Sequence, residues 1–188
     1  MLDSIISIDN QIFCSINEYV KKSLIIDKIM IFLAEYAQFI FPLLLIPLWL
    51  TKKRKNRLVV LQTALAFSCA FILLKIIKVF SYRARPFVSH LDINQLVEHS
   101  INSSFPSNHA TSAFVIATTI FLFYRRLGTV CLLLSCGIAF SRIWVGVHYP
   151  LDVITGIILG TSIGLAFHLF FKRFTKHLNS ITIFQEKI

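Results

Sequence analysis

The sequence predicts an all-α integral membrane bundle of five transmembrane helices, or six if the N-terminal segment also crosses the bilayer. Hydrophobic residues make up 56% of the 188 residues and charged residues only 15%, which is more apolar than an ordinary soluble domain. The apolar residues also gather into five runs, most of them close to the roughly 20 residues that a helix needs to cross the hydrocarbon layer. A lipid environment accounts for both observations.

The five expected spans lie, in order, at Leu24–Leu50, Leu58–Phe80, His109–Tyr124, Leu127–Val145 and Leu151–Phe171. Before them, the segment Ile5–Tyr19 mixes apolar residues with Asp, Asn and Glu, which predicts an amphipathic helix on the membrane surface. A short re-entrant or sixth spanning segment is the alternative. The chain therefore divides into an N-terminal interfacial segment (1–23), a transmembrane domain (24–174) and a cytoplasmic tail (175–188).

Basic residues outnumber acidic ones, with 19 Lys and Arg against 9 Asp and Glu. They follow the first, third and fifth spans, at Lys52–Arg57, Arg125–Arg126 and Lys172–Lys176. By the positive-inside rule these three connections are cytoplasmic, so the excess is a topology signal and nucleic acid is excluded as a partner. The N-terminus, the segment 81–108 and the turn at His148 then lie on the outer side.

A first cluster of interest is at the end of the second span. Lys78 and Arg85 are seven residues apart, so they share one helical face if the helix continues to Arg85 and stops at Pro86. Two cations on one face can bind a phosphate group. The alternative is that both side chains only anchor the helix among lipid headgroups.

A second cluster opens the third span. Ser107 suits the N-cap position, and the free backbone N–H groups of a helix start bind anions. His109 follows in the first turn and is suited to donate a proton, since histidine titrates near neutral pH. A cap followed by an interfacial histidine is the alternative interpretation.

A third cluster lies between the last two spans. Pro150 suits the first position of a helix, which places Asp152 within reach of His148. An aspartate bonded to one imidazole nitrogen leaves the other free to act as a nucleophile. Asp152 alternatively only complements the helix dipole. Four further residues at this side or within a span are second-rank candidates to which no role is assigned, with a hydrogen bond inside the bundle as the equal alternative: Glu35, Tyr36, Lys75 and Arg83. In the polar segment Phe87–Phe105, His90 and His99 are expected as surface or packing residues, with contact to substrate as the alternative.

These residues resemble the three-part signature of the type-2 phosphatidic acid phosphatase (PAP2) superfamily: Lys-x6-Arg-Pro, Pro-Ser-Gly-His and Ser-Arg-x5-His-x3-Asp. The matching stretches are Lys78–Pro86, Pro106–His109 and Ser141–Asp152. One departure is Asn108 in place of the usual glycine. With this residue and the segment Ile26–Ala37, the chain resembles the bacitracin-resistance type of undecaprenyl-pyrophosphate phosphatase.

The resemblance implies a phosphohistidine mechanism in which His148 is the nucleophile, Asp152 orients it and His109 protonates the departing oxygen. The phosphate oxygens would be held by Lys78, Arg85, Ser107, Arg142 and backbone N–H groups near Asn108. Three cations can supply the charge stabilisation that Mg²⁺ gives in other enzymes, so no metal ion or other cofactor is expected.

The expected function is therefore removal of the terminal phosphate from undecaprenyl diphosphate, or a similar polyprenyl diphosphate, at the outer face of a bacterial cell membrane. The product would be recycled as a carrier lipid for peptidoglycan synthesis. A phosphatidylglycerophosphate or phosphatidate phosphatase is the alternative within the family. A noncatalytic lipid-phosphate binding or transport protein is the alternative from another class, although binding alone needs the cations and not the two histidines.

Overall fold

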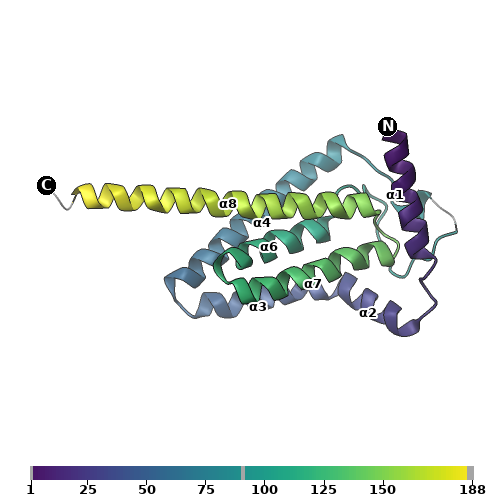
Figure 1. Cartoon of the computed structure of the whole chain (residues 1–188), viewed down its shortest axis with the longest axis horizontal. Helices are drawn as coiled ribbons and strands as arrows, with labels where there is room; N and C mark the ends of the chain where they lie inside the picture. Colours follow the sequence, from purple (N-terminus) through teal and green to yellow (C-terminus); the bar gives the residue numbers. More distant parts are fainter. Residues whose placement is uncertain (1, 90–91, 186–188) are drawn as a thin grey trace.

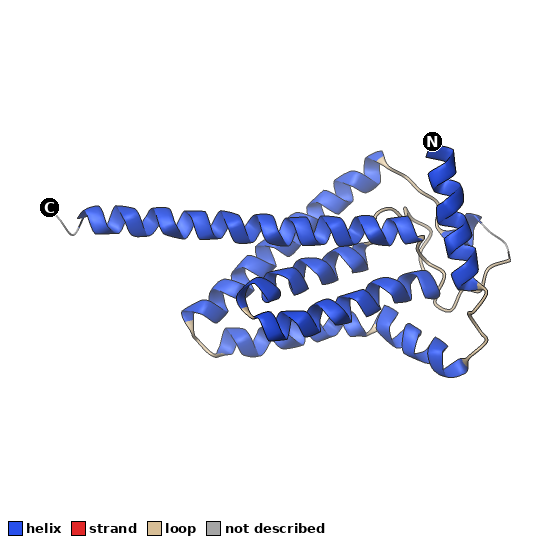
Figure 2. Cartoon of the chain, viewed as in Figure 1, coloured by secondary structure: helices blue, strands red, loops and turns tan. Residues whose placement is uncertain are grey.

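The computed structural model describes residues 2–89 and 92–185, and over these ranges it consists of helices joined by loops and turns (Figures 1 and 2). The all-α prediction is confirmed. The elements are α1 (Leu2–Asn17), α2 (Leu24–Glu35), the 3-10 turn η1 (Ala37–Phe39), α3 (Ile40–Leu50), α4 (Arg54–Phe80), α5 (Pro86–Ser89), α6 (Asn108–Phe123), α7 (Arg125–Trp144) and α8 (Pro150–Gln185).

Helix α6 forms the centre of the bundle and packs against α4, α7 and α8. Most of its 16 residues are buried, including Phe114, Val115 and Ile120. Because neighbouring helices rather than lipid cover it, α6 does not need the full length of a lipid-exposed span. Large apolar side chains of the outer helices, such as Leu65 and Ile72 of α4, are exposed on the bundle surface.

Within the part of the chain that the structure describes, three helices are long and apolar enough to cross a membrane: α4, α7 and the Pro150–Arg173 part of α8. Helix α2 and the segment Ala37–Leu50 together form a fourth candidate, which is bent by 44°. The run expected as one span at Leu24–Leu50 is thus broken. Pro42 explains part of the break, because it has no N–H to donate to the carbonyl of Gln38 and so disfavours one continuous helix. Helix α6 is apolar but shorter.

Glycines bring α8 unusually close to α6. Gly156 and Gly160 are four residues apart on one face of α8, and a Cβ on Gly160 would lie 2.5 Å from the carbonyl oxygen of Thr111. A Cβ on Gly156 would lie 2.9 Å from the carbonyl oxygen of Ser107. Small residues at such spacing let two helix backbones touch. The contact fixes the beginning of α6 against the beginning of α8.

Helix α1 crosses the end of the bundle at which α6 and α8 begin and α7 ends (Figure 1). Asp9, Phe13 and Asn17, spaced by four residues, are buried on one face of α1, whereas Ile8 and Ile12 are exposed. The predicted amphipathic helix is therefore present, but its buried face meets protein. The opposite end of the bundle carries the basic residues of the α3–α4 and α6–α7 connections, and α8 extends far beyond it as a helix (Figure 1).

Candidate active site

His148 lies in the short connection between α7 and α8. Gly146 has a φ of +83°, a left-handed conformation that favours glycine and lets the chain turn sharply after α7. Pro150 begins α8, as the sequence predicts. The turn places His148 Nδ1 3.5 Å from Asp152 Oδ2, and both side chains are almost completely buried. This distance is a contact rather than a formed hydrogen bond, and such contacts commonly shorten when substrate binds.

The surroundings of His148 select its tautomer and its charge. Nε2 lies 3.2 Å from Arg85 Nη1. Because a guanidinium only donates, Nε2 carries the lone pair and the proton is on Nδ1, facing Asp152. Burial lowers the pKa of His148 to about 3, and Arg85 acts in the same direction while Asp152 opposes it. The imidazole is therefore neutral at physiological pH, as a nucleophile must be.

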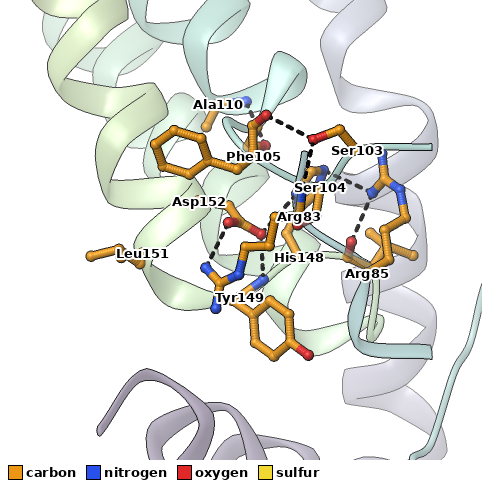
Figure 3. Close-up of polar contacts among 12 residues, drawn as sticks. Arg83, Arg85, Ser103, Ser104, Phe105, Ala110, His148, Tyr149, Leu151 and Asp152 are labelled. Carbon is orange, nitrogen blue, oxygen red and sulfur yellow. Dashed lines mark hydrogen bonds and ion pairs between the residues drawn. The ribbon is translucent and has the colours of Figure 1, made fainter. Parts of the chain in front are cut away.

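Asp152 is held at both carboxylate oxygens (Figure 3). Oδ1 accepts a hydrogen bond of 2.8 Å from Arg83 Nη1, and Oδ2 accepts one of 3.0 Å from the backbone N–H of Tyr149. Arg83 also lies over the Tyr149 ring, 4.0 Å from its centroid. Sequence reasoning assigned Arg83 no role, although its position two residues before Arg85 was a usable signal.

Arg85 is 2% exposed, and all three nitrogen atoms of its guanidinium donate hydrogen bonds. Its Nε and Nη2 donate to Asn102 Oδ1 at 3.0 and 2.8 Å, and Nη1 donates to the carbonyl of Val147 at 2.7 Å. Burial lowers the pKa of Arg85 to about 10, so it stays charged at neutral pH. Asn102 belongs to the long polar loop and was not predicted to orient Arg85.

Arg142 lies near the end of α7 and is completely buried. Nη1 donates to the carbonyl of Ala34 at 2.8 Å and lies 3.3 Å from Glu35 Oε1. Its Nε and Nη2 have no hydrogen-bond partner within the described residues. Unpaired buried donors of a charged group are costly, so this guanidinium is suited to an anionic ligand.

Helix α6 begins at the end of the bundle that carries His148 and Asp152. Ser107 is the N-cap, since its side chain accepts from the N–H of Ala110 at 3.4 Å, and its own N–H donates to the Asp152 carbonyl at 3.0 Å. His109 lies in the first turn, within electrostatic range of Arg142 and His148. Asn108 is exposed.

One local prediction is wrong. Helix α4 ends at Phe80, so Lys78 and Arg85 do not share a helical face, and Pro86 begins the short α5 instead of ending a helix. The intervening segment bonds to the polar loop: the N–H of Arg83 donates to Ser103 Oγ at 3.2 Å, and the N–H of Ser104 donates to the Arg83 carbonyl at 2.8 Å. These bonds compete successfully with continuation of the helix.

The predicted site residues nevertheless gather at one end of the bundle. Lys78 Nζ donates to the carbonyl of Ser103 at 3.2 Å, next to the segment that carries Arg83. His99, expected as a surface or packing residue, lies close enough for burial and the charge of Arg85 to lower its pKa. His90 lies outside the described residues. Among the side chains that the structure describes, at residues 4–89 and 92–173, no three His, Cys, Asp or Glu form a cluster able to hold a metal ion.

Comparison with known sequences gives one family. The model of the PAP2 superfamily matches residues 57–176. "Bacitracin transport permease protein BcrC" of Bacillus licheniformis is 42% identical over 148 residues, covering 79% of this chain and 73% of the relative. "Undecaprenyl-diphosphatase BcrC" of Bacillus subtilis is 32% identical over 160 residues, covering 85% and 82%. "Putative undecaprenyl-diphosphatase YbjG" of Escherichia coli is 35% identical over 132 residues, covering 69% and 66%.

Two solved structures share the fold. Aquifex aeolicus LpxE superposes with a TM-score of 0.70 at 28% identity, covering 84% of this chain and 92% of that one. A transmembrane PAP2 type phosphatidylglycerolphosphate phosphatase from Bacillus subtilis superposes with a TM-score of 0.72 at 22% identity, covering 90% and 87%. The second likeness concerns the fold alone.

Proposed function

This chain belongs to the PAP2 superfamily, and we propose that within it the chain is an undecaprenyl-diphosphatase that works through a phosphohistidine. The observation that supports this chemistry best is a buried, neutral His148 that contacts the Arg85 guanidinium and lies within electrostatic range of Arg142. The Arg142 guanidinium keeps two N–H donors unpaired among the described residues. Such a pocket favours a phosphoryl group over a neutral ligand.

The phosphate is held by the charges and dipoles around His148. Arg142 presents its unpaired Nε and Nη2, which match the planar two-point recognition of a phosphate. Arg85 lies beside the attacking nitrogen, where it stabilises the charge on the equatorial oxygens. The binding site is completed by Lys78, Ser107 and the N–H groups at Asn108. The last two belong to the start of α6, where free backbone N–H groups bind anions.

The first chemical step transfers the terminal phosphoryl group to the protein. Nε2 of His148 forms a bond to phosphorus while the bond to the bridging oxygen breaks, and His109 gives a proton to that oxygen. Asp152 holds the Nδ1 proton and stabilises the positive charge that develops on the ring. A water molecule, deprotonated by His109, then attacks phosphorus, releases inorganic phosphate and restores His148.

A polyprenyl diphosphate is the substrate that the relatives favour. Two of the relatives above carry the name undecaprenyl-diphosphatase, and their similarity extends over at least two thirds of this chain. The Asn108 that replaces the usual glycine of the signature is exposed at the start of α6, where it would contact the diphosphate. Membrane lipids surround the bundle, and the polyprenyl tail would lie among them.

The charge distribution supports a membrane orientation with the site outside. We propose five crossings, with the bent α2–α3 pair as the first and the protein-covered α6 as the third. The basic connections then face the cytoplasm of a bacterial cell, and α1, the polar loop and His148 face the opposite side. The end of α8 beyond Arg173 would extend into the cytoplasm.

Phosphate release by the detergent-purified protein tests this function. The substrates are undecaprenyl diphosphate and phosphatidylglycerophosphate, each with a chelator present. We expect faster release from undecaprenyl diphosphate and a loss of at least about 10³-fold in His148→Ala. The matched control His168→Ala should leave the rates unchanged, because His168 packs against Phe123 at the other end of α6. Faster release from the glycerolipid would reassign the substrate, and no release from either would favour a noncatalytic binder.

A further inference from the structure

Helix α1 supplies a buried carboxylate to the active-site end of the bundle. Asp9 is 4% exposed, and no part of the family signature includes it. Its Oδ2 lies 2.5 Å from Arg83 Nη2, and its Oδ1 accepts a hydrogen bond of 2.8 Å from the N–H of Leu151. Leu151 is in the first turn of α8, so Asp9 satisfies one of the free N–H groups of the helix that carries Asp152.

Arg83 joins Asp9 to the predicted catalytic pair. Its Nη2 binds Asp9 while Nη1 binds Asp152 Oδ1 at 2.8 Å, so one guanidinium bridges two buried carboxylates. Asp152 in turn contacts His148. The result is a continuous row of side chains from α1 to the nucleophile: Asp9, Arg83, Asp152 and His148.

Other contacts hold α1 in place at this end. Asn17 and Asn94 of the polar loop exchange three hydrogen bonds, of 2.9, 2.8 and 3.3 Å. The ring of Phe13 packs edge-on against Tyr149, with centroids 5.3 Å apart. The face of α1 formed by Asp9, Phe13 and Asn17 is therefore docked along its length, and Asp9 has a fixed position relative to Arg83.

We propose that Asp9 and Arg83 are positioning residues of the active site, so that α1 is part of the catalytic apparatus and not only a membrane-surface helix. This inference rests on the proposed function of His148 and Asp152. Arg83 alone would neutralise Asp152 and weaken its hold on the His148 proton. Because Asp9 shares the Arg83 guanidinium, Asp152 keeps enough negative charge to stabilise the imidazolium. The guanidinium is bonded to both carboxylates, which fixes the orientation of Asp152.

The test uses the full-length protein with Asp9→Asn and Arg83→Lys. The asparagine keeps an oxygen for the Leu151 N–H but removes the charge, and the lysine keeps the charge but cannot bridge both carboxylates. We expect each variant to lower kcat on undecaprenyl diphosphate by roughly 10- to 100-fold while KM changes less than about threefold, since neither side chain binds substrate. The double variant should be no slower than Arg83→Lys, because both changes break one row of contacts.

A second readout does not depend on the substrate. With ¹⁵N-labelled histidine, the His148 ring, assigned by comparison with His148→Gln, should show the Nδ1-protonated tautomer in both the parent and Asp9→Asn, because Arg85 donates to Nε2. The Nδ1–H signal should shift in Asp9→Asn toward that of a weaker hydrogen bond. The matched control is Glu18→Gln, which removes an exposed carboxylate just beyond the same helix and should alter neither kcat nor the spectrum.

Parental kcat and an unchanged His148 spectrum in Asp9→Asn would overturn the positioning role. A slower Asp9→Asn with a higher KM and an unchanged spectrum would overturn it too, because the residue would then act on substrate binding. If instead the parent released no phosphate, the proposed function would fail, while the spectra would still decide whether Asp9 strengthens the hydrogen bond at His148 Nδ1.

Discussion

At the scale of single residues, two side chains of the candidate site carry a cost in the folded protein. His148 is buried without charge, and Arg142 is buried with charge and with two donors unpaired among the described residues. Neither arrangement stabilises the fold, because buried polar groups contribute only when they are paired. Both suit a site prepared for the oxygens of a phosphoryl group.

Arg142→Lys tests the binding half of this interpretation. A lysine keeps the charge but cannot present two N–H groups in one plane. We expect kcat/KM on undecaprenyl diphosphate to fall by roughly 10²-fold. Arg125→Lys, at the exposed start of the same helix, is the matched control and should behave as the parent. Equal activity of the two variants would show that the Arg142 guanidinium does not hold the phosphate.

The burial of His148 also predicts how stability depends on pH. In the unfolded chain its pKa is near 6.5, whereas in the folded protein it is about 3. Between these values only the unfolded chain binds the proton, so the free energy of unfolding decreases as the pH falls below 6.5, by up to about 1.4 kcal/mol per pH unit. Unfolding measured at pH 7.5 and 5.5 should show a smaller decrease in His148→Gln, and an equal decrease would contradict the neutral histidine.

Local spacing made part of the site predictable. The contact of His148 with Asp152 and the N-cap at Ser107 depend on residues at most four apart, so the sequence pattern contains them. The partners of Arg83 are 69 and 74 residues away in the sequence, and those of Arg85 are 17, 62 and 63 residues away. Such pairs depend on how the loops fold back, which periodicity does not encode.

At the scale of elements, the site depends on the contact between α6 and α8. The two helices begin side by side because Gly156 and Gly160 leave no side chain between them, and Ser107 then bonds to the backbone of Asp152. The five apolar runs predicted this set of helices. They also placed the end of the second run at Phe80, where α4 ends. They did not predict the bend between α2 and α3, because hydropathy does not register breaks inside an apolar segment.

Gly160→Ala tests the helix contact. Its Cβ would lie 2.5 Å from the Thr111 carbonyl oxygen, so the backbones must separate, at a cost of roughly 1–3 kcal/mol. The matched control is Gly137→Ala in α7, whose Cβ meets only the Leu33 side chain at 3.5 Å. We expect a lower Tm and lower activity for Gly160→Ala, and an unchanged or higher Tm for the control, since alanine favours helix. Equal Tm values would contradict the close approach.

At the scale of the whole molecule, the charged residues of the candidate site and the basic residues of the helix connections lie at opposite ends of the bundle. The candidate site, α1 and the polar loop occupy one end, and the basic connections between helices occupy the other (Figure 1). Because α1 is docked through buried side chains at the first end, the chain before the spans belongs to the same folded body as the site. The sequence pattern did not predict this docking, because it indicated only an amphipathic helix.

If His148 carries the phosphoryl group during turnover, that group can be trapped on it. The purified protein would be mixed with undecaprenyl diphosphate labelled with ³²P in the terminal phosphate, with a chelator present, and quenched in alkaline denaturant after milliseconds to seconds. We predict label on a peptide containing His148 in the parent, more label than in Asp152→Asn, and none in His148→Ala. Label elsewhere, or turnover by His148→Ala at the parental rate, would contradict the account.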